Sequence, residues 1–361
     1  MSARSVMDAL DRDRYDIVPI GITKEGRWLP SADSLSTLES VAGVKQGSAG
    51  ASQPSSASGT CSLDASLPGA DHSRRDLLPG LDAAGIPYVD VLFPVLHGPY
   101  GEDGTVQGLF ELAGIPYVGA GVLGSALAMD KVAMKAVFRA EGFPVAHYLP
   151  VRRWEWDQGP AEVTSRVEQR IGYPCFVKPA NLGSSVGVTK VHAASELPAA
   201  LDAAARYDRK MLVEKAVNAR EIECSVLGND HPVVSLPGEV IPRREFYDYQ
   251  AKYFDRATQL TVPAVLTTGK AAEIQDLAAS AFVALDCAGM ARADFFVDRV
   301  TEQVYINELN TIPGFTAVSM YPRMWAASGL PYPELLDRLI QLAFERHSDL
   351  GRRSTSYKSH D

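Results

Sequence analysis

Two segments near the C-terminal end of the chain alternate apolar and polar residues as β-strands do. Residues 292–297 read Arg-Ala-Asp-Phe-Phe-Val, and residues 304–310 read Val-Tyr-Ile-Asn-Glu-Leu-Asn. The residues between them, 298–303, are mostly polar, which is typical of a turn. Because successive side chains of a strand point to opposite faces, this pattern predicts an antiparallel β-hairpin.

The predicted hairpin brings candidate metal ligands together. If its turn places Asp294 opposite Glu308, antiparallel pairing also places Arg292 opposite Asn310, so four polar side chains converge. Two carboxylates and an amide oxygen suit Mg²⁺, and the neighbouring arginine suits a phosphate or an oxyanion. Taken alone, the same residues fit a surface hairpin with solvated charges equally well.

The N-terminal region shows a less complete pattern. A helix over 2–10 leads into an apolar strand over 15–23. A helix that enters a strand normally completes a βαβ unit, and the strand that should precede this helix is absent, so we expect that the chain lacks its start. Residues 38–68 are rich in Ser, Gly and Ala, which predicts a disordered surface insertion.

Two glycine-rich segments follow the insertion. The apolar run 89–96 predicts a buried parallel strand, and the loop 97–104 at its carboxyl end places His97 at the edge of a candidate ligand site. A histidine that caps a turn is the alternative. Residues 119–124 match GxGxxG, but no acidic residue follows at the end of a second strand, since Glu141 comes before the next predicted strand, 143–149. We therefore interpret 119–124 as a tight turn between domains.

The central region contains a loop with phosphate-binding character. Lys178 lies on the strand before the loop 183–187, which reads Gly-Ser-Ser-Val-Gly. Glycines let backbone N–H groups approach phosphate oxygens, Ser184 and Ser185 add hydroxyl donors, and Lys178 adds a positive charge. For this segment alone, a plain turn is the alternative.

Two glutamates come next, at the ends of neighbouring predicted strands. Glu214 ends the strand that begins at 211, and Glu221 lies where the following strand begins. Acidic side chains beside a nucleotide can accept hydrogen bonds from an adenine amine or from ribose hydroxyls. A solvated strand end is the alternative for either residue.

Composition and charge narrow the class of protein. The chain has 361 residues, 46% hydrophobic and 22% charged, which predicts a soluble folded protein of two or three domains. A net charge of −9 with no basic stretch argues against binding nucleic acid or a membrane surface. The four cysteines form no CxxC pair, and there is no signal-peptide pattern or membrane-spanning run, so we expect a cytoplasmic protein with reduced thiols.

Taken together, these motifs resemble those of ATP-grasp ligases, and specifically those of the D-alanine:D-alanine ligase family. The motifs are HGPYGEDG at 97–104, MDK at 129–131, the lysine strand with its GSSVG loop, EKAVNAREIE at 214–223, EFYDYQAKY at 245–253, RADFF at 292–296 and NELNTIPGFT at 307–316. Each is ordinary alone, and their order over residues 2 to about 345 makes the resemblance specific.

The resemblance implies a fold and an activity. The fold is α/β, α+β in part: an ATP-grasp fold with an N-terminal parallel-sheet domain (1–121), a central domain (122–213), a C-terminal catalytic domain (214–347) and a disordered tail (348–361). The implied activity is ATP-dependent, ADP-forming ligation of two D-alanine molecules through a D-alanyl phosphate, for peptidoglycan synthesis. The implied cofactors are ATP and two Mg²⁺ or Mn²⁺ ions, and the implied assembly is a homodimer.

The resemblance also assigns roles to residues. The nucleotide would be held by Lys131, Lys178 and Ser185 at its phosphates, by Glu214, Lys215, Ala216 and Val217 at the adenine, and by Glu221 at the ribose. The metal ligands would be Asp294, Glu308 and Asn310. The catalytic group would comprise Arg292, Ser184, Tyr249 and the Gly314 backbone. The amino-acid substrates would meet His97, Ser319 and Lys252.

One departure from the family pattern leaves alternatives open. Members of the family begin with a strand and a loop whose glutamate holds the ammonium group of the first D-alanine, and this chain starts after that loop. We therefore expect ATP binding with little dipeptide synthesis unless the upstream residues are restored. The alternatives are a D-alanine:D-lactate ligase, although the tyrosine in 245–253 favours the amine substrate, a truncated inactive ATP-binding homologue, and a Rossmann dehydrogenase.

Overall fold

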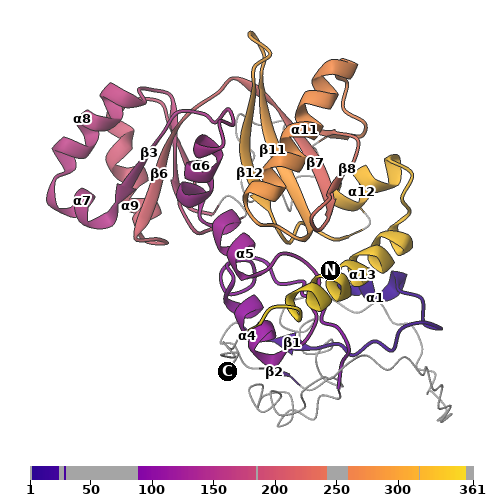
Figure 1. Ribbon diagram of the computed structural model, residues 1–361. Helices are drawn as coiled ribbons and strands as arrows, with labels where there is room; N and C mark the ends of the chain where they lie inside the picture. Colours follow the sequence, from indigo (N-terminus) through magenta and orange to yellow (C-terminus); the bar gives the residue numbers. More distant parts are fainter. Residues whose placement is uncertain are drawn as a thin grey trace, which may run out of the picture. The chain divides into compact units, whose positions relative to one another are not determined.

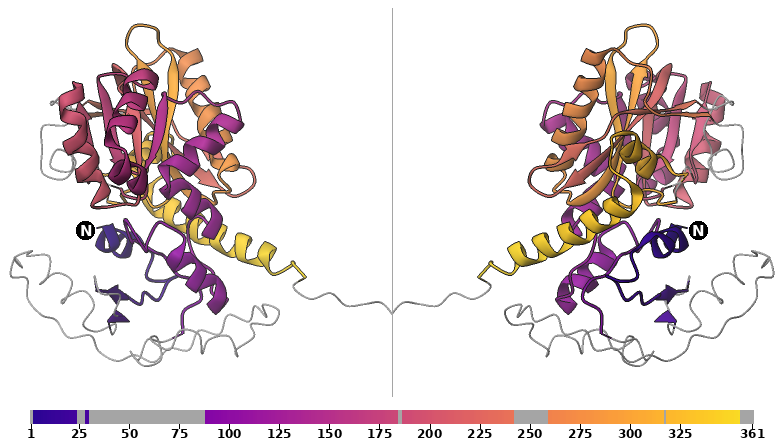
Figure 2. Two further views of the ribbon diagram at one scale, coloured as in Figure 1. Left: turned by 90° about the vertical axis from the view of Figure 1, so that its left-hand side faces the viewer. Right: turned by 90° about the vertical axis from the view of Figure 1, so that its right-hand side faces the viewer.

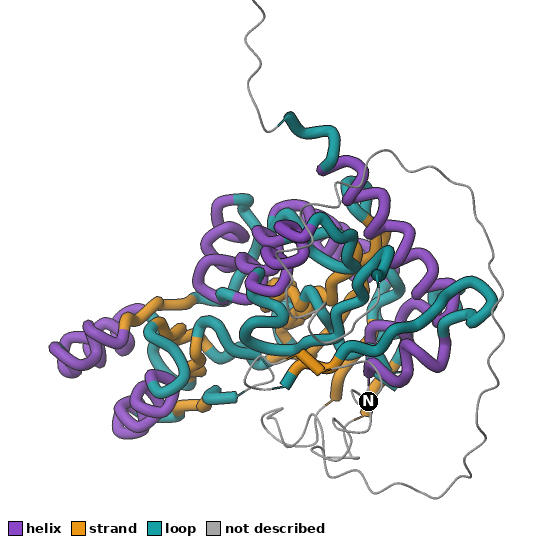
Figure 3. The backbone as a smooth tube through the Cα atoms, turned by 90° about the horizontal axis from the view of Figure 1, so that it is seen from below, coloured by secondary structure: helices purple, strands orange, loops and turns teal. Residues whose placement is uncertain are grey.

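A computed structural model describes residues 2–23, 28–29, 88–183, 186–241, 259–316 and 318–354 (Figure 1). These residues combine helices with mainly antiparallel strands (Figure 3). The chain divides into two compact units, a larger one of residues 1–11, 91–110 and 116–361, and a smaller one of residues 12–90 and 111–115. The boundaries of the three predicted domains stay a prediction.

The described part of the smaller unit contains one short antiparallel pair. β1 (Gly21–Ile22) pairs with β2 (Trp28–Leu29). The strand predicted over 15–23 is wrong for residues 15–20, which form no strand. Pro19 lies in the middle of that run and has no N–H to donate to a neighbouring strand. The predicted insertion at 38–68 lies outside the described residues.

The larger unit begins with the predicted N-terminal helix, α1 (Ser2–Ala9). The buried strand predicted over 89–96 is wrong for most of its length, because only Leu92 forms a bridge, which is parallel and made with Tyr117. Pro94 interrupts this run as Pro19 does the earlier one. The helices of this region are α4 (Thr105–Ala113) and α5 (Val122–Met129).

A four-stranded antiparallel sheet occupies the centre of the chain. Its order is β3 (Tyr148–Arg152), β6 (Lys210–Lys215), β4 (Cys175–Pro179) and β5 (Thr189–Val191). Three helices cover one face, namely α7 (Arg153–Gln158), α8 (Pro160–Arg170) and α9 (Leu197–Ala205), the last preceded by a 3₁₀ turn, Ala194–Glu196 (Figure 1). Apolar side chains from these helices and strands form one buried core.

The strand predicted over 143–149 is wrong for residues 143–147, because β3 begins at Tyr148. The residues before it serve another purpose. Phe143 packs against the core of the second sheet, and the Pro144 carbonyl accepts a hydrogen bond of 2.8 Å from the Ile306 N–H. The segment therefore covers part of an edge strand of the other sheet, which would otherwise carry unpaired backbone groups.

The second sheet is six-stranded and antiparallel. Its order is β10 (Gln259–Thr261), β9 (Gly238–Ile241), β7 (Ala219–Gly228), β11 (Gly289–Asp298) and β12 (Val304–Asn310), with β8 (Val233–Val234) paired to β7. The helix α11 (Thr268–Ala284) covers one face, where Cys224 and Val226 of β7 join its core (Figure 2). Ser225, which points to the other face, donates a hydrogen bond to the Tyr321 carbonyl.

Three further helices surround this sheet. α6 (Lys131–Ala140) lies between the two sheets, α12 (Met320–Ala327) packs on the face opposite α11, and α13 (Tyr332–Leu350) closes the chain (Figure 1). Because α13 continues to Leu350, the first three residues of the tail predicted over 348–361 are helical, and residues from 355 onward lie outside the described residues. Within the described part of the chain, no helix combines the length and apolarity needed to cross a membrane.

Candidate active site

The register of the C-terminal hairpin is confirmed. In the pairing of β11 with β12, Asp294 lies opposite Glu308 and Arg292 lies opposite Asn310. The alternation of apolar and polar residues fixes this register, because a shift by one residue would turn the apolar set out of the core. The sequence therefore predicts correctly which side chains share the same end of the hairpin.

The hairpin also contains an irregularity that the sequence did not predict. The residue pair after Asp294 and Glu308 is Phe295 with Ile306, so Asn307 has no partner in β11. An extra residue of this kind is a β-bulge, which bends a strand and changes the direction of the side chains beside it. The bulge thus lies directly next to Glu308, one of the predicted metal ligands.

Arg292 is buried among acidic groups. Its guanidinium donates two hydrogen bonds of 2.7 Å to the carboxylate of Asp294, one to each oxygen, and lies 3.2 Å from Oε2 of Glu223. Burial by itself would lower the pKa of Arg292, but the attraction of Asp294 and Glu223 outweighs it and raises the pKa well above its ordinary value. Arg292 therefore remains a fixed positive charge on the hairpin.

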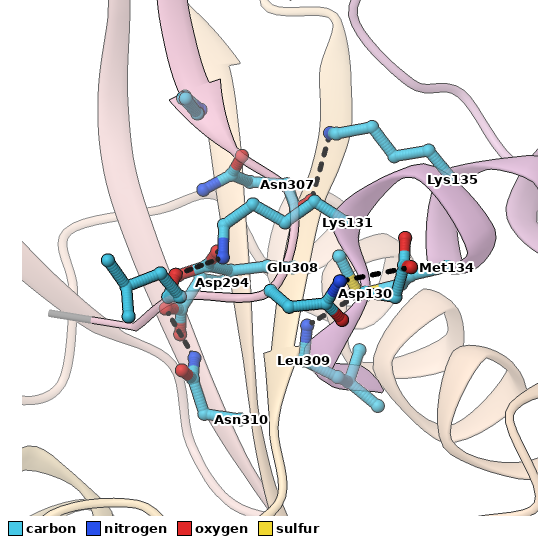
Figure 4. A network of polar contacts seen from close by, with 12 residues as sticks. Asp130, Lys131, Met134, Lys135, Asp294, Asn307, Glu308, Leu309 and Asn310 are labelled. Carbon is cyan, nitrogen blue, oxygen red and sulfur yellow. Dashed lines mark hydrogen bonds and ion pairs between the residues drawn. The ribbon is translucent and has the colours of Figure 1, made fainter. Parts of the chain in front are cut away.

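Glu308 and Asn310 of the hairpin line a small pocket. Figure 4 shows their polar contacts with Lys131 and Asp294. Asn310 donates its side-chain N–H to Oδ2 of Asp294 at 3.0 Å. Glu308 lies 3.5 Å from Nζ of Lys131, which also donates a 2.9 Å hydrogen bond to the Leu182 carbonyl. The residues that line the pocket are Glu102, Ala128, Met129, Lys131, Gly183, Glu308, Leu309, Asn310 and Thr311. Residues from the HGPYGEDG loop, the MDK helix and the hairpin therefore meet at one place.

Lys131 is positioned by the start of α6. Asp130 is the N-cap of this helix, and its carboxylate accepts hydrogen bonds of 3.0 Å from the backbone N–H groups of Val132 and Ala133. Burial would raise the pKa of Asp130, but its contact with Lys210 and these N–H groups lowers the pKa below its usual range. The cap fixes where the helix begins, and hence where Lys131 points.

A buried cluster of three charges lies beside the pocket. The carboxylate of Glu214 contacts Nζ of Lys178 through Oε2 and Nζ of Lys135 through Oε1, at 2.6 Å in each case. Burial would raise the pKa of Glu214, yet the two lysines lower it to about 2. Glu214 is therefore ionised. We call Lys135, Lys178 and Glu214 the buried lysine cluster.

The cluster is electrostatically linked to the hairpin and to β7. For Lys178, burial acts to lower the pKa, but Glu214, Glu308 and Glu221 raise it above its ordinary value. For Lys135, burial dominates and lowers the pKa, although Glu214 opposes this shift. The structure thus brings five predicted residues, Lys131, Lys178, Glu214, Glu221 and Glu308, into one electrostatic neighbourhood.

The segment after Glu214 is held by its backbone. The Lys215 N–H donates to the His147 carbonyl at 2.8 Å, and the Ala216 N–H donates to the Pro174 carbonyl at 3.2 Å. The side chain of Lys215 donates to the Tyr173 carbonyl at 3.1 Å. These contacts fix the connection that includes Val217, and its role toward adenine stays a prediction.

Of the other predicted site residues, three are described by the structure and four are not. Gly314 and Ser319 lie together, since a Cβ at Gly314 would be 3.1 Å from the Ser319 hydroxyl, which itself contacts the Thr316 hydroxyl at 2.7 Å. His97 is exposed, in the loop that also contributes Glu102 to the pocket. The predicted residues that lie outside the described ones are Ser184, Ser185, Tyr249 and Lys252.

Sequence reasoning missed three polar residues of this site. Lys135 is four residues after Lys131, a spacing that puts both on one helix face. Glu223 is two residues after Glu221 and so shares its face of the strand. Glu102 lies within the HGPYGEDG loop itself. Each spacing was visible in the sequence, but none showed which residues would be buried together.

The hairpin residues suit a divalent cation by their chemistry. Among the described residues, no three His, Cys, Asp or Glu side chains form a group that could hold a metal ion. The predicted set has two carboxylates, Asp294 and Glu308, and is completed by the amide of Asn310. Because Asn310 donates to Asp294 through nitrogen, its oxygen is left as an acceptor. Three oxygen donors on one end of a hairpin fit Mg²⁺ or Mn²⁺.

Comparisons with known proteins cover almost the whole chain. A family model described as D-ala D-ala ligase C-terminus matches residues 137–341, and one described as D-ala D-ala ligase N-terminus matches residues 1–120. The D-alanine–D-alanine ligase of Natranaerobius thermophilus is 47% identical over 357 residues, which are 99% of this chain and 93% of that protein. The one from Ruminiclostridium cellulolyticum is 48% identical over 363 residues, 99% and 94% of the two chains.

Solved structures give the same result. The D-alanine-D-alanine ligase from Coxiella burnetii superposes with a TM-score of 0.76 at 35% identity, covering 97% of this chain and 90% of the other. The VanG D-Ala:D-Ser ligase from Enterococcus faecalis also gives 0.76, at 34% identity, covering 95% and 94%. The predicted ATP-grasp fold is confirmed, and the chain belongs to the D-alanine–D-alanine ligase family.

Proposed function

We propose that this protein is an ATP-dependent ligase that joins two D-alanine molecules for peptidoglycan synthesis in the cytoplasm. The observation that carries the proposal is its similarity, at 47% identity over 99% of the chain, to a D-alanine–D-alanine ligase. The site supports it, since Lys131, Glu308 and Asn310 line one pocket. The pair of Arg292 with Asp294 lies on the same hairpin, and Lys178 is held by Glu214. These groups suit a reaction in which phosphate and an oxyanion carry developing negative charge.

The nucleotide is assigned to the region between the two sheets. Lys131 and Lys178 hold its phosphates, together with Ser185 of the loop 183–187. Glu214 and the connection 215–217 hold the adenine, and Glu221 holds the ribose. The electrostatic influence of both Glu214 and Glu221 on Lys178 supports this assignment, because the three side chains are close enough to act on one another.

The metal ions, two Mg²⁺ or Mn²⁺, are assigned to Asp294, Glu308 and Asn310. When bound, such an ion neutralises charge on the phosphates and on the transferring phosphoryl group. Lys131 is paired with Glu308 in the structure and would turn toward the nucleotide when a cation takes its place. The buried pair of Arg292 and Asp294 keeps the aspartate carboxylate in one orientation.

The reaction has two chemical steps. A carboxylate oxygen of the first D-alanine attacks the terminal phosphorus of ATP, the bond to ADP breaks, and an acyl phosphate forms. The amine of the second D-alanine then attacks the acyl carbon, loses a proton, and expels phosphate as the peptide bond forms. Arg292 and the Gly314 backbone stabilise the oxyanion of this second step.

The remaining residues bind and enclose the amino acids. His97 contacts the first substrate, while Ser319 and Lys252 contact the second. Ser184 and Tyr249 exclude water from the acyl phosphate, which would otherwise hydrolyse. The contact of Ser319 with Thr316 and its closeness to Gly314 support a shared role at the second amino acid. We also propose a homodimer, the assembly that the resemblance implies.

The choice of second substrate depends on a small chemical difference, because D-alanine offers an amine nucleophile where D-lactate offers a hydroxyl. The likeness to a D-Ala:D-Ser ligase favours a comparison with D-serine beside D-lactate. The experiment supplies ATP, Mg²⁺ and D-alanine, then adds D-serine, D-lactate or L-alanine, and identifies the products by mass spectrometry. D-Alanyl-D-alanine as the main product supports the proposal. ATP hydrolysis with no ligated product contradicts it.

A further inference from the structure

Lys135 is a buried charged residue to which the proposed reaction gives no part. It lies on α6 and is 1% exposed. Its ammonium group lies 2.6 Å from Oε1 of Glu214 and donates a hydrogen bond of 2.9 Å to the Asn307 carbonyl (Figure 4). Burying an ammonium group in the interior is costly unless it is paired, so a lysine at this place needs an explanation.

The contact with Asn307 affects the proposed metal ligands, because Asn307 directly precedes Glu308 in β12. Asn307 is the bulged residue of β12, so its backbone is not fixed by a partner in β11. Lys135 supplies that constraint from α6. Two other residues of α6 contact the residues after Asn307. Lys131 pairs with Glu308, and the Met134 sulfur accepts a hydrogen bond of 3.3 Å from the Leu309 N–H. The direction of Glu308 is therefore set by a helix as well as by the sheet.

The contact with Glu214 acts on the nucleotide side. Lys135 and Lys178 each take one oxygen of the same carboxylate. When Lys135 is protonated, the two ammonium groups and one carboxylate give the cluster a net charge of +1. If Lys135 were neutral, Glu214 would neutralise Lys178 completely, and little positive field would remain for a nucleotide phosphate. Water screens these charges poorly, because the side chains of Lys135 and Glu214 are only 1% and 2% exposed.

We propose, on the basis of the proposed function, that Lys135 is a positioning residue. Its hydrogen bond to the Asn307 carbonyl fixes the direction of the neighbouring Glu308. Its ion pair with Glu214 offsets part of that carboxylate's charge, so that the positive charge of Lys178 remains available to the nucleotide phosphates. Protein atoms enclose its ammonium group, so it acts through these neighbours and not by touching substrate. One side chain thus sets the phosphate-binding and metal-binding halves of the site relative to each other.

The test replaces Lys135 by methionine, which keeps the length and apolar volume of the side chain without its charge. The matched control is Lys270→Met. Lys270 also contacts one carboxylate and one carbonyl, those of Glu273 at 2.7 Å and Glu302 at 2.9 Å, but it lies on α11, which carries none of the proposed site residues. Its side chain is 21% exposed, so this variant controls for the loss of a lysine charge and its two contacts at a less buried place.

The readouts separate positioning from stability. For Lys135→Met we expect kcat to fall on the order of 10²-fold, as for misplaced reacting groups. Its dissociation constant for ATP with Mg²⁺, from calorimetry, should rise roughly tenfold. The KM for D-alanine should stay the same, because no amino-acid contact changes. Lys270→Met should match the parent protein in all three. A folded Lys135→Met with parental kcat and ATP affinity overturns the proposal, even if its Tm is lower.

A second variant at the same position keeps the test decisive if Lys135→Met does not fold, which circular dichroism would show. Lys135→Arg keeps the charge but places a wider, planar group against the Asn307 carbonyl. It should therefore retain the parental ATP affinity and lose kcat, whereas parental values for both overturn the proposal. If the parent protein itself forms no ligated product, the proposed function fails, and the ATP affinities of the three variants still decide the role of Lys135.

Discussion

The hairpin and the buried lysine cluster supply the same site in different ways. The hairpin residues are close in sequence, as Asp294 and Asn310 are 16 residues apart. The cluster is assembled from α6, β4 and β6, and its link from Lys135 to the Asn307 carbonyl joins residues 172 positions apart. A local pattern of strand and turn sets the first arrangement. Packing of distant elements sets the second.

The two regions also differ in exposure, and this difference separates their roles. The side chains of Asp294 and Glu308 are 15% and 26% exposed, so they can reach a ligand. The side chains of Lys135 and Glu214 are almost fully buried. Removing one partner of a buried ion pair leaves an uncompensated charge, whereas a partly exposed charge can be solvated. We therefore expect changes in the cluster to lower stability as well as nucleotide binding and turnover, and changes in the hairpin to act mainly on chemistry.

The largest effect should come from Glu214→Gln. This substitution leaves two buried ammonium groups without their shared carboxylate, and breaking a buried pair in this way costs about 3 to 5 kcal/mol of stability. Urea unfolding at pH 7 would measure the loss. The control is Glu345→Gln, which removes a carboxylate from an exposed pair with Arg338. Equal unfolding midpoints for Glu214→Gln and the parent would mean that the cluster does not stabilise the fold.

The parent protein and Glu214→Gln can also be compared as a function of pH. Glu214 has a pKa of about 2 in the folded chain against an ordinary value of 4.5. A lowered pKa means that its contribution to stability is complete above about 4.5 and is lost as the pH falls from 4.5 toward 2. The stability gap between parent and Glu214→Gln should therefore narrow only in that window. A gap that narrows near neutral pH would point to another group.

Arg292→Ala should have the next largest effect, and it acts on chemistry. The loss of a preorganised positive group at a developing oxyanion lowers kcat by about 10² to 10³, or about 2.7 to 4 kcal/mol. ATP binding should be largely retained, because the arginine acts on charge that forms during the reaction. Single-turnover assays and calorimetry measure the two separately. Turnover within a few-fold of the parent would remove Arg292 from the oxyanion site.

Glu308→Gln and Asp294→Asn should change the requirement for metal. Each replaces a charged oxygen ligand by a neutral amide, so the Mg²⁺ concentration that gives half-maximal activity should rise on the order of tenfold or more. A magnesium titration of both variants beside Glu345→Gln measures this shift. Unchanged midpoints in both variants would mean that the hairpin is not the metal site.

The smallest expected effect is that of Asp130→Ala at the start of α6. Loss of the N-cap costs about 0.5 to 2 kcal/mol. Lys131 and Lys135 follow within the first two turns of this helix, so ATP affinity should fall slightly with the stability. Asp130→Asn should restore most of both, because asparagine also caps helices well. Equal melting temperatures for the alanine variant and the parent would contradict the role of the cap.

Three strands were predicted too long, and they share one feature. Pro19, Pro94 and Pro144 lie within the runs 15–23, 89–96 and 143–149. Proline cannot donate to a ladder and is confined to edges or ends of strands, so hydrophobicity alone was misleading there. The hairpin contains no proline between Gly289 and Asn310, and its register was predicted correctly.

In the site, too, the sequence predicted the contacts within the hairpin but not those between elements far apart in the chain. Asp294, Glu308, Arg292 and Asn310 were paired correctly from alternation, given a turn that places Asp294 opposite Glu308. The closeness of Lys135 to Glu214 depends on how α6 packs between two sheets, which no local pattern encodes. The same holds for Glu223, which meets Arg292 only through the pairing of β7 with β11.

The central claim is that this protein activates a D-alanine carboxylate by phosphorylation and then joins it to a second D-alanine. The most direct measurement uses D-alanine with both carboxylate oxygens replaced by ¹⁸O, together with ATP and Mg²⁺. The account predicts that each dipeptide formed is accompanied by one inorganic phosphate that carries one ¹⁸O atom, because the attacking oxygen leaves with the phosphate. Phosphate released without the label, or without an equal amount of D-alanyl-D-alanine, would contradict the account.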